Sequence, residues 1–332
     1  MINKDQKLVE DIFNKKTIKK IPIRDGYGKG VVEVGEKDER IVVLCADLME
    51  STRSHWFEEK FPERYIEIGV AEQNLATVAA GLAIYGKIPF ISSYAVFSPG
   101  RNNEQIRTLI SLNNLPVKII GAHAGVSVGP DGATHQALED IALMRVQPNM
   151  TVVVPADMEE AQKAILASVK KSGPFYLRLA REKTPLFTTK DSPFEIGKAN
   201  VLYDSDKIEI VIIACGSLVY NALLVAEELS KEKINVAVIN NHSIKPMDNK
   251  TILKYAQKAG AVVTVEEHQI AGGMGSAVAE LLAKEYPVPI EFIGVNDRFG
   301  QSGTPDELIE YYGMGVGSIK EAVKKVIKRK SV

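Results

Sequence analysis

The chain has 332 residues, of which 45% are hydrophobic and 25% are charged. This is the composition of a globular protein long enough for two domains, each with its own core. The 41 Lys and Arg residues nearly balance the 42 Asp and Glu residues, giving a net charge of -1, so no general attraction to nucleic acid or to an anionic membrane is expected. The start, MINKDQKLVEDIFNKK, has no apolar signal core, and the longest apolar run, IVIIAC, is far below the roughly 20 residues of a membrane span. We therefore expect a cytoplasmic enzyme or binding protein.

The first half of the chain alternates apolar runs with helical patterns. The runs at 41–47, 117–122 and 151–155 are short, continuous and rich in β-branched residues, as strands buried on both faces of a parallel sheet are. They are preceded by an amphipathic N-terminal segment with Leu8, Val9, Ile12 and Phe13 on one face. Helices are predicted over 71–85, 103–113 and 135–144, and another after Asp157, where DMEE is similar to a capping box.

The stretch 181–198 contains two prolines and has no period, and it predicts a domain boundary. Beyond it the alternation restarts, with strands at 208–214, 235–240, 261–267 and 290–295 and helices from about 218, 248 and 274. The sequence TPDE at 304–307 is a further helix start. We predict an α/β protein of two doubly wound domains, 1–190 with a mostly parallel sheet and a smaller one at 199–332.

The two cysteines, Cys45 and Cys215, lie in apolar strand-like runs, where buried reduced thiols are expected. Two glycine clusters carry little chemistry. GYGKG (26–30) lacks the spacing of a dinucleotide fingerprint, and AGGMGS (271–276) opens a helix and is better explained as a tight turn than as an anion site. Phosphate-loop and zinc motifs are absent from the sequence.

A richer cluster is GAHAGVSVGPDGATHQALED, residues 121–140, which follows a predicted strand. It places His123, Asp131 and His135 on one glycine-rich loop, and such loops at the carboxyl ends of parallel strands bind ligands in α/β proteins. A second candidate is Glu72, a carboxylate between a strand-like run and a small-residue helix. Tyr94 and Phe97, three residues apart after another predicted strand, could clasp a flat ring beside that acid.

Together these segments resemble a known family. IGVAEQN, SSYAVFSPGRNNEQIR and GPDGATHQALEDIALMRVQPNM are similar to the pyrimidine-binding domain of transketolases, and GSLVYNALLVAEEL and GGMGSAVAE to their C-terminal domain. The resemblance runs from about residue 20 to the end. Transketolases hold thiamine diphosphate and its Mg²⁺ or Ca²⁺ through a Gly-Asp-Gly motif, which this sequence lacks. The resemblance therefore implies the C-terminal subunit of a split transketolase, without metal ligands of its own, whose N-terminal partner subunit holds the metal and the pyrophosphate.

The resemblance also assigns cofactor contacts to residues. Glu72 matches the acid that hydrogen-bonds N1′ of the aminopyrimidine ring and promotes proton removal from the thiazolium. Tyr94 and Phe97 match aromatics that pack on the pyrimidine, whereas Gly100 stands where long transketolases have a third aromatic. Asp47 and Leu48 match positions beside the thiazolium.

Substrate contacts follow in the same way. His135 and Asp131 match residues that read the donor's hydroxyls, and His135 is suited to proton transfer. Four residues match the family's ligands of the sugar phosphate: His123, Arg24, Ser51 and Arg181. Arginine suits this role because its planar guanidinium can contact two phosphate oxygens at once. Arg178 lies close enough in sequence to compete with Arg181 for this role. The implied reaction is transfer of a two-carbon ketol unit from a ketose phosphate to an aldose phosphate, in an α2β2 assembly that pairs through the pyrimidine domains.

Two alternatives remain at this point. The β subunit of a 2-oxoacid dehydrogenase has a similar length, two such domains and the same glutamate, but needs fewer hydroxyl-reading groups on its loop. A non-catalytic scaffold with this fold would have little reason to keep Glu72, His123, Asp131 and His135, since buried polar groups without partners cost about 1–3 kcal/mol each.

Overall fold

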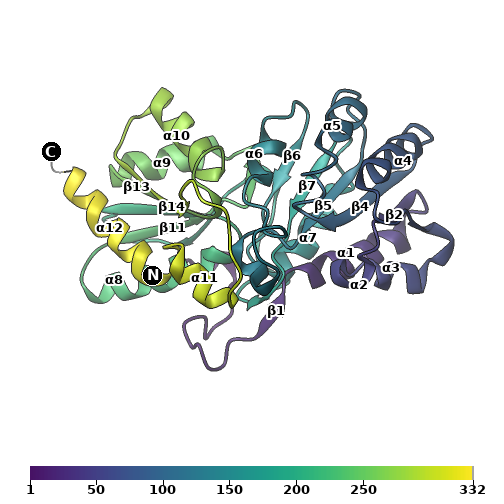
Figure 1. Ribbon diagram of the computed structural model, residues 1–332. Helices are drawn as coiled ribbons and strands as arrows, with labels where there is room; N and C mark the ends of the chain where they lie inside the picture. The colour runs from purple at the N-terminus through teal and green to yellow at the C-terminus, as the bar shows by residue number, and fades with distance from the viewer. Residues whose placement is uncertain (331–332) are drawn as a thin grey trace.

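The computed structural model describes residues 1–330 and contains two α/β units side by side (Figure 1). The first is built on a seven-stranded sheet in the order β12-β6-β7-β5-β4-β2-β3. Its strands are β2 (Ile41–Cys45), β3 (Tyr65–Glu67), β4 (Ile88–Tyr94), β5 (Lys118–Ala122), β6 (Thr151–Val153), β7 (Phe175–Arg178) and β12 (Ser243–Lys245). All neighbours are parallel except β12, which pairs antiparallel with β6. This is the mostly parallel sheet that the apolar runs predict.

Helices cover both faces of this sheet. One face carries α1 (Arg24–Lys37), α2 (Met49–Thr52), α3 (His55–Lys60) and α7 (Met158–Ser168), and the other α4 (Glu72–Ile84), α5 (Asn103–Gln105) and α6 (Asp140–Arg145), as Figure 1 shows. Short connections form 3-10 helices at Lys4–Gln6, Pro62–Arg64, Val126–Asp131 and Gly216–Leu218. The small two-stranded sheet pairs β1 (Lys20–Pro22) with β8 (Lys183–Pro185).

The second unit contains a five-stranded sheet in the order β14-β13-β10-β11-β9. Its strands are β9 (Asn200–Tyr203), β10 (Ile210–Ala214), β11 (Val236–Asn240), β13 (Val262–Gln269) and β14 (Ile290–Val295), and only β9 is antiparallel to its neighbour. Its helices are α8 (Val219–Lys231), α9 (Asn249–Ala259), α10 (Met274–Glu285), α11 (Pro305–Tyr311) and α12 (Val316–Lys330). The fold class is therefore as predicted, a pair of α/β units with the larger mostly parallel sheet in the first.

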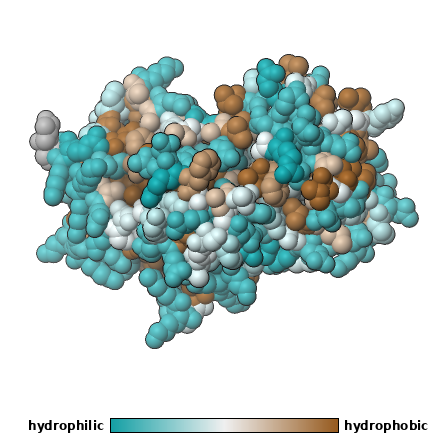
Figure 2. Space-filling model, viewed as in Figure 1, coloured by the Kyte–Doolittle hydropathy of each residue, from teal (hydrophilic) through white to brown (hydrophobic). Residues whose placement is uncertain are grey.

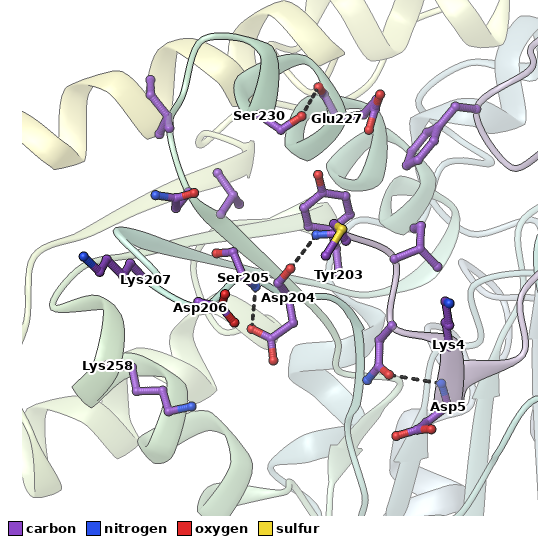
Figure 3. Close-up of a pocket in the computed structure, with 17 residues that line it drawn as sticks. Lys4, Asp5, Tyr203, Asp204, Ser205, Asp206, Lys207, Glu227, Ser230 and Lys258 are labelled. Atoms are coloured by element: carbon purple, nitrogen blue, oxygen red, sulfur yellow. Dashed lines mark hydrogen bonds between the residues drawn. The ribbon is translucent and has the colours of Figure 1, made fainter.

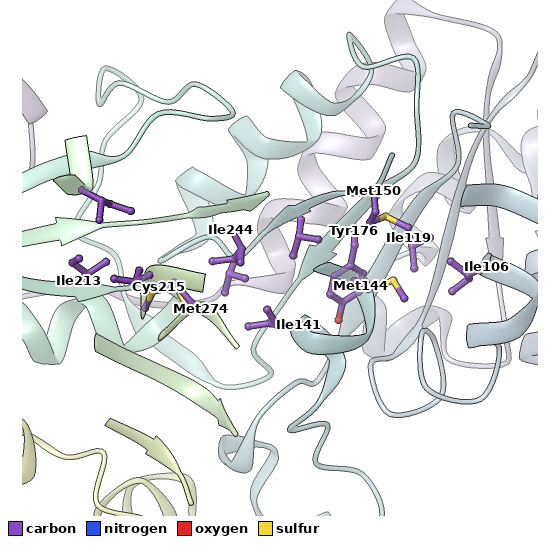
Figure 4. Close-up of a cluster of buried hydrophobic side chains, with 14 of the residues drawn as sticks. Ile106, Ile119, Ile141, Met144, Met150, Tyr176, Ile213, Cys215, Ile244 and Met274 are labelled. Atoms are coloured by element: carbon purple, nitrogen blue, oxygen red, sulfur yellow. The ribbon is translucent and has the colours of Figure 1, made fainter. Parts of the chain in front are cut away.

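One hydrophobic core continues from the first unit into the second. It includes Ile106 and Met144 on one side and Ile213 and Met274 on the other, and Figure 4 shows these side chains in one row. Two further large cores lie on the outer faces of the two sheets, and a small fourth cluster consists of Ala95, Ala124 and Ala137. Within residues 1–330, no helix is long and apolar enough to cross a membrane.

Several local expectations are confirmed. Both cysteines are buried and free. Asp157 caps α7 by accepting a hydrogen bond from the backbone N of Glu160, and Thr304 forms a capping box with Glu307. The glycine turn before α10 is no anion site, because the Glu266 carboxylate already accepts hydrogen bonds from the backbone N of Met274 and Gly275.

Two helix predictions are wrong in detail. The predicted helix over 135–144 is reduced to α6, because residues before it fold back on the loop, with the N–H of Gly125 donating to the carbonyl of Ala137. The predicted helix over 103–113 starts as α5 and continues as a π-helix at Ile106–Ser111. The amphipathic N-terminal segment lies in turns, and its apolar face packs on the core of the second unit as the pattern suggests.

Candidate functional site

Most of the predicted site residues lie at the carboxyl edge of the first sheet. Asp47 follows β2, Glu72 follows β3, Tyr94 ends β4 and His123 follows β5, and Arg181 follows β7. Because these strands are parallel neighbours, their ends meet at one edge, where α/β sheets bind ligands.

Glu72 is the first residue of α4 and its side chain is only 1% exposed. Its Oε2 accepts a hydrogen bond from Nη1 of Arg101 at 2.8 Å, and its backbone carbonyl accepts one from Nδ2 of Asn102 at 3.0 Å. A carboxylate at a helix N-terminus is favoured by the helix dipole, and a buried carboxylate needs a partner, which here is a half-exposed cation.

Four ring side chains gather next to this acid. Tyr94 and Phe97 lie nearly parallel, with centroids 6.1 Å apart and planes 16° apart. The His123 ring stacks on Tyr94 at 3.9 Å. His135 stands edge-on to Phe97 at 5.5 Å and to Tyr94 at 6.0 Å. The structure therefore brings together the aromatic pair and both loop histidines, which the sequence places in separate segments.

Arg101 was not predicted from the sequence. Its guanidinium carbon lies 4.9 Å from the centroid of the Phe97 ring, so the same group contacts the ring and the buried carboxylate of Glu72. The residue before it, Gly100, offers no third aromatic wall. A Cβ there would stand 2.0 Å from the carbonyl oxygen of Val96, so the backbone excludes any larger side chain.

Arg24, at the start of α1, joins this cluster through His123. Its Nη1 donates to the carbonyl of Ser51 at 2.8 Å and to Nε2 of His123 at 3.2 Å. Burial first, and then the charges of Arg24, Arg181 and Arg53, lower the pKa of His123 to about 2. The ring is thus neutral, and because Nε2 accepts from Arg24, its proton is on Nδ1.

Among residues 1–330, two buried donors in this group find no hydrogen-bond partner, Nδ1 of His123 and Nε of Arg24. Buried polar atoms are nearly always paired, so unpaired donors point to a missing acceptor. Arg181 donates to the carbonyl of Val128 at 2.6 Å and is partly exposed. Its competitor Arg178 is buried in an ion pair with Asp140 at 2.8 Å, which removes it as a phosphate ligand.

The remaining predicted residues are more exposed. Asp131 ends the 3-10 helix Val126–Asp131 on the surface of the loop, and Nδ1 of His135 lies 2.9 Å from the hydroxyl of Thr134. Asp47 has a left-handed backbone, φ 56°, and its N–H donates to Glu67. Leu48 precedes α2 and is half-buried. Ser51 contributes its carbonyl, not its hydroxyl.

A wide hollow of about 1220 Å³ lies elsewhere, on the second unit (Figure 3). It is lined by the first residues of the chain and by Tyr203–Lys207 on β9 and the turn after it, and shares no residue with the ring cluster. Charged side chains of both signs lie on its walls, including Asp206, Lys207 and Lys258, so no single ligand charge is selected.

Comparisons with known proteins identify the family of both halves of the chain. The transketolase pyrimidine-binding domain matches residues 19–185, and the transketolase C-terminal domain matches residues 197–319. The chain is 43% identical to a protein of Methanocaldococcus jannaschii named as a transketolase C-terminal section, over 92% of this chain and 96% of that one. It is 39% identical to the 6-deoxy-6-sulfo-D-fructose transketolase subunit SqwH of Clostridium sp., over 93% of this chain and 95% of that one.

A solved structure described as a split gene transketolase, inactive beta4 tetramer, superposes with a TM-score of 0.87 at 45% identity, covering 93% of this chain and 99% of that one. Human transketolase is 35% identical, and the chain spans 49% of its length. The matched domains cover both sheets and the loop with the two histidines. The chain belongs to the transketolase family.

Proposed function

We propose that this chain is the C-terminal subunit of a split transketolase, which transfers a two-carbon ketol unit from a ketose phosphate to an aldose phosphate with thiamine diphosphate. The observation that carries the proposal is the buried Glu72 carboxylate, paired with a planar cation lying over the Phe97 ring. A guanidinium there presents to the carboxylate the planar N–H donor that a protonated aminopyrimidine ring would present. The residues thus fit the pyrimidine half of the cofactor once Arg101 moves aside.

In that arrangement Glu72 would share a proton with the ring nitrogen N1′, and Phe97 and Tyr94 would pack against the ring. Asp47 and Leu48, at the end of β2, would lie beside the thiazolium. Bound thiamine diphosphate supplies the nucleophilic carbon and the electron sink for carbon–carbon cleavage. The protein's share is to orient the reactants and to exchange protons at Glu72 and His135.

The sugar phosphate would lie against the arginine group. Arg24 and His123 offer unpaired buried donors, and Arg181 adds a third positive or polar contact at the rim. The carbonyl rather than the hydroxyl of Ser51 fixes Arg24, so Ser51 would act by orienting that arginine. His135 and Asp131 would read the donor's hydroxyls, with His135 standing against Phe97.

The proposal includes a separate N-terminal subunit that holds the pyrophosphate and Mg²⁺ or Ca²⁺. Three observations support it: no Gly-Asp-Gly occurs in the sequence, two relatives are named as a section or a subunit, and apolar side chains stay exposed around α4. Val70, Ile84 and Tyr85 are 70%, 72% and 89% exposed. In Figure 2, the hydrophobic residues exposed on the visible face lie mainly on the first unit. We propose that partner chains cover them in a cytoplasmic α2β2 assembly.

The test is reconstitution with the N-terminal subunit of the same organism, Mg²⁺ and thiamine diphosphate. Xylulose 5-phosphate with ribose 5-phosphate should be converted, and pyruvate with a dye acceptor should not. Glu72→Gln keeps the shape but not the charge, and should lower turnover by about a hundredfold or more with cofactor still bound. The surface variant Glu104→Gln is the control. Wild-type turnover by Glu72→Gln with bound cofactor would refute the role of the acid.

A further inference from the structure

The carboxyl end of β13, in the second unit, contacts the loop that holds the two site histidines. The sequence there is VEEHQ, residues 265–269, and three consecutive residues of it bond to the loop and its continuation into α6. The loop comes from the first unit, so this contact joins the two units directly beside the candidate site.

The shortest of these hydrogen bonds is made by Glu267, which is buried. Its Oε1 accepts a hydrogen bond from the backbone N of Ser127 at 2.6 Å, and its Oε2 accepts one from the hydroxyl of Ser217 at 3.2 Å. The loop backbone approaches closely at Gly125, where φ is +91° and a Cβ would stand 2.2 Å from Oε1 of Glu267. Only glycine allows this approach. The carboxylate thus holds the incoming end of the loop.

The outgoing end is held through the backbone of the same strand. Nη2 of Arg178 donates to the carbonyl of Glu267 at 2.8 Å and to that of Ala137 at 3.2 Å. The N–H of Gln269 donates to the carbonyl of Leu138 at 2.9 Å. Arg178 is itself fixed by Asp140, which also accepts a hydrogen bond from Tyr176 at 2.6 Å.

Asp131 and His135 therefore lie between an anchor at Ser127 and one at residues 137–138. Within the segment, the carbonyls of Val128 and Gly129 also accept hydrogen bonds from Arg181 and Gln136. The segment between the anchors contains Gly129 and Gly132, both with positive φ, and such a segment would populate many conformations if its ends were free. Small displacements of catalytic groups cost large factors in rate.

We propose that the end of β13 positions the donor-binding loop, with Glu267 and Arg178 as positioning residues that set where His135 and Asp131 stand. In this proposal the second unit contributes to the reaction by positioning the loop. That the loop binds the donor substrate rests on the proposed function. The anchoring of the loop does not depend on that function.

The strand supplies its own matched control. Glu266 is the neighbouring buried carboxylate, but it accepts hydrogen bonds from Met274 and Gly275 at the start of α10 and does not bond to the loop. The variants Glu267→Ala and Glu266→Ala each remove one buried carboxylate from the same strand. The milder pair Glu267→Gln and Glu266→Gln keeps the side-chain volume in case the alanine variants fold poorly.

Hydrogen exchange of the isolated chain tests the anchoring without any activity. Backbone amides of 125–137 should exchange at least about tenfold faster in the Glu267 variants, whereas the Glu266 variants should accelerate exchange at 273–278 instead. Unchanged exchange at 125–137 in the Glu267 variants would overturn the proposal, even if the reconstituted enzyme is active.

Kinetics of the reconstituted complex test the consequence. Glu267→Gln should raise the KM for xylulose 5-phosphate about tenfold and leave the concentration of thiamine diphosphate needed for half activity within twofold, while Glu266→Gln changes neither. A purely structural role would lower the active fraction and hence turnover without changing KM. Equal KM values for both variants would overturn the positioning role. Absence of activity in the wild-type complex would instead refute the proposed function, and the exchange result would still decide the anchoring.

Discussion

At the scale of single residues, Glu72 and Arg101 pair a buried carboxylate with a half-exposed guanidinium. The carboxylate is 1% exposed and the guanidinium side chain 50% exposed. A buried charge is costly without a partner, so the acid needs a cation or a proton donor in every state of the protein. Arg101 meets that need in the isolated chain, and it lies on the ring that a bound pyrimidine would cover.

This arrangement predicts competition between Arg101 and the cofactor. Arg101→Met should tighten binding of thiamine diphosphate to the reconstituted complex by about fivefold, because no ion pair of about 1 kcal/mol must be broken first. The same change should lower the stability of the isolated chain by a similar amount. Titration followed by fluorescence or calorimetry measures the affinity, with the exposed Arg107→Met as control. Weaker binding would show that Arg101 contacts the cofactor instead.

A site residue could be predicted from the sequence only where a local sequence motif marks it. His123 and His135 stand in a glycine-rich loop after an apolar strand, and Glu72 stands between a strand-like run and a small-residue helix. The resemblance added roles to these candidates. No such motif marks Arg101 or Glu267, because their contacts are made only when distant segments meet: Glu267 lies 140 residues from Ser127. The assigned chemical roles stay predictions.

At the scale of elements, local signals predicted helices where capping and period agree and failed where tertiary contacts prevail. The helix from Asp157 begins as expected because its cap is local. The region 135–139 has helical periodicity but bonds to Gly125 and β13 instead. Tertiary contacts of this kind outweigh helix propensity, which is worth less than about 1 kcal/mol per residue.

Asp157 does more than an ordinary helix cap. Besides the N–H of Glu160, its carboxylate accepts hydrogen bonds from Phe187 N, Thr188 N and the Thr188 hydroxyl, in the segment that leads to the second unit. We expect Asp157→Ala to lower the free energy of unfolding by about 2–3 kcal/mol, because buried donors lose their acceptor. Thr304→Ala, which removes a cap at the surface, should cost about 1 kcal/mol. Urea denaturation followed by circular dichroism measures both changes in the free energy of unfolding. Equal losses of stability in the two variants would show that the hydrogen bonds of Asp157 to the segment leading to the second unit add nothing to its helix cap.

At the scale of the whole molecule, the two units are more closely joined than a boundary near residues 190–199 suggests. Strand β12, from the second half of the chain, extends the first sheet, and the N-terminal residues bond to β9 in the second unit. The division into 1–190 and 199–332 stays a prediction. These contacts between the two halves of the chain could not be predicted from the sequence, because a three-residue strand and a turn-rich segment have no hydrophobic periodicity.

Glu160 lies at this junction, and it predicts how stability depends on pH. It is buried on α7 and accepts hydrogen bonds from Ala156 N and from Nδ2 of Asn240 on β11. Burial first, and then the charge of Asp157, raise the pKa of Glu160 from 4.5 to about 7. Between these values the folded chain binds a proton that the unfolded chain has lost. The contribution of Glu160 to stability is therefore present at low pH and is lost as the pH rises through this window.

Glu160→Gln removes that dependence without changing the shape of the side chain. The side-chain amide of Asn240 can rotate by about 180° so that its Oδ1, which has no partner within the described part of the chain, accepts from the new amide. We expect the free energy of unfolding of Glu160→Gln, relative to wild type, to rise between pH 5 and pH 8 by up to about 3 kcal/mol. Urea denaturation at both pH values measures this, and Glu159→Gln on the same helix reports the effect of losing any carboxylate. A relative stability that stays constant, or falls, over this range would show that Glu160 is ionised in the folded protein throughout, and that the junction tolerates its charge.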